Sequence, residues 1–234
     1  RPATKEEYDE GLLTSQPYRQ VVKRAPDGTY WRKNEDTYTE RLRPFKAFFD
    51  SFYEGAYHYS LERECAFTVY DLSERFGIVI VGFNSCDEID GYLSGGRFAS
   101  LDSRAFISTD AVYAAEHSEE FRRNRTDLLR IAAFHHNIRS VDHSPDFLAP
   151  SILGILKRQG YQVCLHGHVH TAEHELFDAT NRRSLPVVGA GSMAARYEDR
   201  PPAAPMGYNL MVLDRLTGGI WVHTRRHDEN NLVW

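Results

Sequence analysis

Long apolar stretches are missing from this sequence. No segment comes near the roughly 20 consecutive apolar residues that a membrane-spanning helix requires. The chain opens with RPATKEEYDE, which is charged and polar and does not resemble a signal peptide. We therefore expect a cytoplasmic protein that has no membrane partner.

An excess of positive charge is also missing. The chain has 28 lysines and arginines against 33 aspartates and glutamates, which gives a formal net charge of -5. A protein with this balance has no general attraction to polyanions. Nucleic acid is therefore not an expected partner.

Cysteine is scarce as well. The three cysteines, Cys65, Cys86 and Cys164, show no Cys-x-x-Cys spacing, and each lies beside or within an apolar run. This pattern favours buried thiols in a reducing compartment. It agrees with the expected cytoplasmic location.

The sequence does contain enough apolar residues for one domain. It has 234 residues, of which 41% are hydrophobic, so a sizeable core is expected. Residues 1–35 are polar and carry turn signals at Pro17 and Pro26, and we expect them to form a polar surface segment. Residues 36–234 are expected to form the globular body. Within that body, phenylalanines at 45, 48, 49 and 52 recur at helical spacing and predict a helix with its aromatic face packed inward.

Apolar runs and helical segments alternate through the middle of the chain. Helices are predicted over residues 110–123 and 146–158, and this alternation is typical of an α/β fold, in which ligands bind at the C-terminal ends of strands. The runs SLPVVGAGS, YNLMVLD and GGIWVHTRR predict short strands of a second, mixed or antiparallel sheet. Strands of the first sheet are predicted over 66–72 (AFTVYDL), 77–84 (GIVIVGFN), 128–134 (LLRIAAF) and 161–166 (YQVCLH). The last three are expected to be buried, and 77–84 is expected to be buried on both faces.

Histidines follow two of these predicted strands. The motif HHN occupies residues 135–137, and the motif GHVH occupies residues 167–170. A loop can fan the two histidines of the second motif around a pair of metal ions, and neutral imidazole binds zinc, manganese and iron. A buried histidine can equally be an ordinary hydrogen-bonded core residue. Spacing alone therefore leaves metal binding and core packing open.

The order of the two motifs resembles the second half of calcineurin-like metallophosphoesterases. In that family a strand with a histidine motif is followed by a helix and then by a closing Gly-His-x-His motif, and the matching segments here are AAFHHN and LHGHVH. The later segments VVGAGS and YNLMVLD look like the family's second sheet. The resemblance covers about residues 36 to 225. It implies an α/β fold, a two-sheet β-sandwich flanked by helices.

The resemblance also implies roles for four histidines. His135 matches a ligand of the family's second metal ion, and His168 matches the first histidine of the closing motif, which binds the same ion. His170 matches the second histidine of that motif, which binds the first metal ion. His136 holds the position beside the ligand, where it would line the site as the candidate catalytic residue.

The motifs with which the family's active site begins are absent. Family members open with Asp-x-His, Gly-Asp and Gly-Asn-His motifs, which supply the bridging carboxylate and further ligands, and none of them occurs here. The chain therefore resembles the C-terminal part of a metallophosphoesterase domain. We expect its fold to be incomplete, a missing N-terminal half to act as its partner, and the chain alone to be inactive.

The activity that the resemblance implies is metal-dependent hydrolysis of a phosphodiester or phosphomonoester by a metal-activated water. The complete protein would hold two divalent metal ions, with manganese, iron and zinc as the candidates. Its substrate would be a small phosphoester, with nucleotides among the candidates. The alternative is a non-catalytic interaction module that keeps the phosphoesterase scaffold.

Overall fold

The computed structural model describes most of the chain. The described residues are 2–14, 22–25, 27–87, 89, 91–94, 97–100, 105–122, 128–139, 147–177, 184–194, 200, 204–214 and 219–228.

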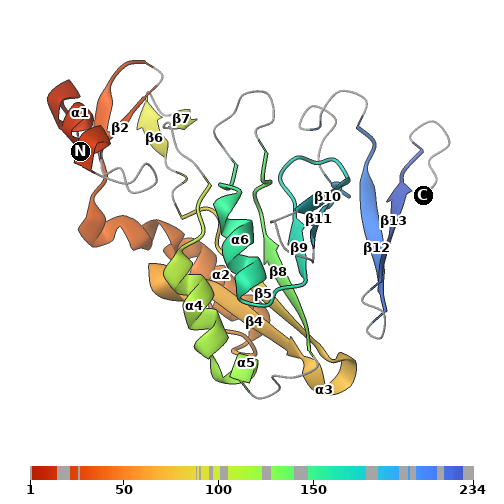
Figure 1. The fold of residues 1–234 in the computed structure, drawn as a ribbon. Coiled ribbons are helices and arrows are strands. Elements are labelled where there is room, and N and C mark those ends of the chain that lie inside the picture. Colours follow the sequence, from red (N-terminus) through yellow and green to blue (C-terminus); the bar gives the residue numbers. More distant parts are fainter. Residues whose placement is uncertain are drawn as a thin grey trace.

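The centre of the fold is a six-stranded sheet with strand order β10-β11-β9-β8-β5-β4 (Figure 1). Its inner strands β5, β8, β9 and β11 run parallel to one another, whereas the edge strands β4 and β10 run antiparallel to them. The four strands predicted for this sheet are confirmed. Their bounds, with those of the two strands at the other edge, are β4 (Phe67–Leu72), β5 (Ile78–Phe83), β8 (Leu129–Phe134), β9 (Val163–His166), β11 (Leu185–Gly189) and β10 (Glu173–Phe177).

Helices that follow β5 and β8 cover one face of this sheet (Figure 1). Val79 and Val81 of β5 are fully buried in the same core cluster as Val112, Leu153 and Leu156, which lie on these helices. The alternate residues of β5 are only half-buried. A strand turns successive side chains to opposite sides. One face of β5 is therefore buried and the other is half-buried, and the expected burial on both faces was wrong.

Both predicted helices are present, with shorter bounds. The segment expected over 110–123 contains α4 (Thr109–His117) and α5 (Glu119–Arg122). The helix expected over 146–158 is α6 (Ser151–Arg158), which begins directly after Pro150, where a proline is tolerated. Residues 123 and 146, at the ends of the two predicted ranges, lie outside the described residues. None of the described helices has the length and apolar character that crossing a bilayer requires.

Only part of the expected second sheet is present among the described residues. β12 (Gly207–Leu213) and β13 (Ile220–Arg226) form an antiparallel pair that is separate from the main sheet (Figure 1). The run SLPVVGAGS was assigned to the second sheet, and this was wrong because its strand β11 pairs with β9 in the main sheet. Strand β10 was not predicted, since its sequence EHELF contains no β-branched residue.

The N-terminal segment carries more regular structure than its polar sequence indicates. Its three strands form a small sheet of order β1-β3-β2. Val22 and Ala25 are each only 3% exposed, so this segment also contributes buried side chains. The remaining described elements are β1 (Pro2–Ala3), α1 (Lys5–Thr14), β2 (Val22–Arg24), β3 (Tyr30–Arg32), η2 (Arg63–Cys65), α3 (Ser73–Phe76), β6 (Gly91–Ser94) and β7 (Arg97–Ser100).

The predicted aromatic helix is α2 (Arg43–Tyr53), which follows the 3-10 helix η1 (Glu35–Leu42). Phe49 is 6% exposed, and its ring contacts those of Tyr53 and Tyr59. The other three phenylalanines are largely exposed, so the expected inward direction of the aromatic face was wrong for Phe48 and Phe52. It holds only in part for Phe45, whose ring also contacts Tyr59 at a centroid distance of 5.0 Å. We call these three phenylalanines the exposed aromatic face: Phe45 (48% exposed), Phe48 (61%) and Phe52 (66%).

Phe49 and Phe48 form a matched pair that tests the orientation of α2. Phe49→Ala removes a buried ring and should lower the free energy of unfolding by about 3 kcal/mol. Phe48→Ala truncates an exposed ring of the same helix and should change that energy by less than about 0.5 kcal/mol. Urea denaturation followed by circular dichroism measures both values. Similar losses for the two variants would contradict the described orientation.

Candidate metal centre

The C-terminal ends of β5, β8 and β9 meet at one edge of the main sheet. The pairing register places Phe134 of β8 opposite His166 of β9, so the residues that follow them, His135 and Gly167, lie side by side. The Gly167 amide donates a hydrogen bond to the His135 carbonyl at 3.0 Å, and the Ala190 amide donates to the His166 carbonyl at 2.8 Å. The ladder thus continues one residue beyond the strands and brings the two histidine motifs together.

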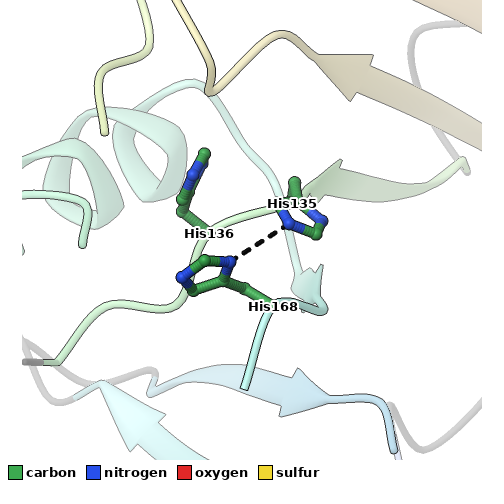
Figure 2. Close-up of side chains that lie close together, drawn as sticks. All are labelled: His135, His136 and His168. Atoms are coloured by element: carbon green, nitrogen blue, oxygen red, sulfur yellow. Dashed lines mark hydrogen bonds between the residues drawn. The ribbon is translucent and has the colours of Figure 1, made fainter. Parts of the chain in front are cut away.

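His135 and His168 are in direct contact, as Figure 2 shows. The Nδ1 atom of His168 lies 3.1 Å from the Nε2 atom of His135. The two rings are nearly perpendicular, at 78°, with their centroids 5.0 Å apart. His135 is exposed and His168 is half-buried, so solvent reaches the pair.

This spacing fits a shared metal ion. Two imidazole nitrogens that bind one zinc ion tetrahedrally, each at about 2.05 Å, are separated by about 3.3 Å. The observed separation of 3.1 Å is close to that value, so the two nitrogens already lie at a suitable distance from each other. In the metal-free protein one ring donates a hydrogen bond to the other. A bound cation would replace that shared hydrogen.

The backbone of the GHVH motif is left-handed at both of its histidines. The φ angle is 71° at His168 and 55° at His170. Residues other than glycine seldom adopt this conformation, which costs about 1–2 kcal/mol at each position. It turns the motif away from strand geometry. Strained residues of this kind concentrate at functional sites.

His136 lies beside the pair and is buried, with 3% exposure. Its ring centroid is 5.0 Å from that of His135 and 4.8 Å from that of His168 (Figure 2). Its Nδ1 atom lies 2.8 Å from the Oγ atom of Ser85, which follows β5 and is 1% exposed. The Ser85 hydroxyl thus connects the end of β5 to the histidine motif after β8.

Asp87 anchors the loop that carries Ser85. It is 5% exposed, and its carboxylate forms an ion pair with the Nε atom of Arg63 and lies 3.8 Å from Arg41. The hydroxyl of Tyr38 donates to the Asp87 carbonyl at 2.8 Å, and the Arg41 guanidinium lies over the Tyr38 ring. Hydrogen bonds to charged groups contribute about 1.5–3 kcal/mol each. Residues before β4 therefore hold this loop in place.

The structure brings together three of the four predicted site residues. His135, His136 and His168 offer nitrogens that all lie within 4.8 Å of one another. His170 lies outside this group, and its assignment to another metal ion stays a prediction. Ser85 and Asp87 were given no role by the sequence, where the only signal was that polar residues follow a buried strand.

Asn137 ends the first histidine motif and is also buried, with 3% exposure. Its side-chain nitrogen donates to the Arg139 carbonyl, and its backbone carbonyl accepts from the Leu148 amide at 2.8 Å. Its Oδ1 atom is buried and has no hydrogen-bond partner among the residues that the structure describes. The residue therefore shapes the loop between β8 and α6.

Comparison with known proteins gives no family for this chain. No protein-family model matches it. None of the curated protein sequences matches it either.

Metal titration tests the His135–His168 pair directly. We expect the wild-type chain to bind one zinc ion weakly, because only two imidazoles hold it. His135→Gln and His168→Gln should each lower the affinity at least about 10-fold, since each removes a ligand. His223→Gln, at an exposed histidine of β13, is the control and should leave the affinity unchanged. Isothermal titration calorimetry gives these values, and equal affinity in all four proteins would rule out the site.

Proposed function

We propose that this chain supplies the histidine side of the active site of a calcineurin-like metallophosphoesterase. The observation that carries this proposal is the His135–His168 contact, with nitrogens 3.1 Å apart, at the ends of adjacent parallel strands. Open α/β sheets bind ligands at this edge. The order of the segments AAFHHN and LHGHVH supports the same function.

His135 and His168 would hold one divalent ion, and His170 would contribute to a second. Manganese, iron or zinc at such a site activates a water molecule and polarises the phosphoryl group of a small phosphoester, with nucleotides among the candidate substrates. His136 would donate a hydrogen bond to a phosphoryl or leaving-group oxygen. The buried position of His136 limits the motion of its ring, which favours a fixed direction for that hydrogen bond.

Carboxylates are missing from the histidine group among the described residues. A carboxylate can bridge two divalent ions through its two oxygens, whereas a neutral imidazole binds only one ion. We propose that a second polypeptide segment, equivalent to the N-terminal half of a metallophosphoesterase, supplies the aspartates. That segment would also complete a sandwich whose second sheet includes β12 and β13. The chain alone would then be inactive.

The test uses the protein purified from its own cells, together with any polypeptide bound to it. Elemental analysis should find about two metal ions per active site. Hydrolysis of p-nitrophenyl phosphate and bis-p-nitrophenyl phosphate should be measured in manganese. His168→Ala should lower the activity at least about 100-fold, because it removes a metal ligand, whereas the control His223→Ala should retain it. Absence of both metal and turnover would contradict the proposal.

The second candidate function is a non-catalytic interaction module. It is supported by the exposed aromatic face of α2, where Phe48 and Phe52 are 61% and 66% exposed. Their ring centroids lie 5.8 Å apart, so they form one continuous surface. Apolar surfaces of this kind mark sites of contact with other polypeptides. An enzyme that needs a second polypeptide segment could use the same face to bind it. Only the assays of metal content and hydrolysis therefore distinguish the two functions.

Sedimentation velocity tests the exposed aromatic face. We expect the chain alone to self-associate as its concentration rises, because exposed phenylalanines are removed from water on contact. The double variant Phe48→Ser, Phe52→Ser should sediment as a smaller species. A folded wild-type monomer at every concentration would argue against an interaction surface here.

A further inference from the structure

The Ser85 hydroxyl makes three polar contacts with the histidine motif after β8. Its Oγ atom accepts hydrogen bonds from the backbone amides of His135, at 3.1 Å, and His136, at 3.2 Å. The same atom lies 2.8 Å from Nδ1 of the His136 ring. All three contacts therefore converge on one buried oxygen.

The number of hydrogens and lone pairs on the Ser85 hydroxyl determines which atom donates in its contact with the His136 ring. A serine hydroxyl has one hydrogen to donate and two lone pairs to accept with. The two backbone amides can only donate, so they occupy both lone pairs. The hydroxyl hydrogen then points to the Nδ1 atom of His136, which accepts it. The reverse direction would place three donors around an oxygen with two lone pairs.

This direction fixes the state of the neutral His136 ring. When Nδ1 accepts a hydrogen bond, the ring hydrogen is on Nε2. Neither nitrogen then offers a lone pair to a cation. His136 is therefore a poor third ligand, although its nitrogen lies within 4.8 Å of those of His135 and His168.

We propose that Ser85 is a positioning residue that holds His136 in the Nε2–H tautomer. It thereby divides the three histidines into two metal ligands, His135 and His168, and one hydrogen-bond donor. The loop around Ser85 is built to keep the hydroxyl in place, since the Cys86 amide donates to Oδ1 of Asn84 at 2.9 Å. The catalytic use of this donor rests on the proposed phosphoesterase function, whereas the tautomer itself does not.

Nuclear magnetic resonance reads the tautomer without an activity assay. The full chain is labelled with 15N-histidine and studied at alkaline pH, and the His136 signals are assigned by their loss in His136→Gln. We expect Nδ1 of His136 to resonate as an unprotonated nitrogen and Nε2 to carry a hydrogen. Added zinc should shift the ring signals of His135 and His168, while His136 keeps its Nε2 hydrogen. A hydrogen on Nδ1, or loss of the Nε2 hydrogen on zinc addition, would overturn the proposal.

Variants at Ser85 show whether the hydroxyl is the cause. In Ser85→Ala the Nδ1 signal should move, because its hydrogen-bond donor is gone. The ring hydrogen can then move from Nε2 to Nδ1, and added zinc should bind at Nε2. Ser85→Thr keeps the hydroxyl and should preserve the wild-type pattern. An unchanged His136 signal in a folded Ser85→Ala protein would contradict the role of the hydroxyl. The wild-type spectrum decides the tautomer even if a variant fails to fold.

Kinetics separate this proposal from the proposed function. In the complete protein, Ser85→Ala should lower kcat about 10-fold with little change in KM, and Ser85→Thr should restore it. Hydrolysis together with a hydrogen on Nδ1 would overturn the positioning role and leave the phosphoesterase function intact. The expected tautomer without any hydrolysis would overturn the phosphoesterase function alone.

Discussion

The parallel pairing of β8 with β9 is the constraint on which the candidate site depends. Ala132 lies opposite Cys164 in this pair, and both are fully buried, so two small side chains pack together in the core at this register. A slip of one residue would turn every side chain to the other face. Burial also raises the pKa of the Cys164 thiol, which therefore stays protonated and unreactive. The buried cysteine of β9, the strand that precedes His168, therefore serves packing alone.

The loops that follow β5, β8 and β9 position the side chains of the candidate site. Left-handed conformations at His168 and His170 cost conformational energy, and the packing and hydrogen bonds around them must offset it. The loop after β5 is held by the ion pairs of Asp87 and delivers the Ser85 hydroxyl to the histidines. Three strand ends therefore contribute one feature each: an orienting hydroxyl, two adjacent imidazoles and a strained histidine loop.

Two apolar surfaces agree with a role in a larger assembly. Besides the exposed aromatic face of α2, the β12–β13 pair places Val212 opposite Trp221, and these side chains are 48% and 51% exposed. A sheet of two strands has little stability by itself and gains it from further strands or a packed face. The proposed second segment would cover such surfaces and bring carboxylates to the histidines. Folding and chemistry would then require the same partner.

The sequence by itself determined the α/β class, four of the six strands of the main sheet (β4, β5, β8 and β9) and the positions of both histidine motifs. Hydrophobic periodicity and strand ends are local properties, so the sequence carries them. Tertiary structure decided which histidines meet. It placed His136 in the group and His170 outside it, and it joined Ser85 to a ring 51 positions away. It also turned Phe48 outward. Such outcomes depend on strand order and on which surfaces the chain covers, and periodicity carries neither kind of information.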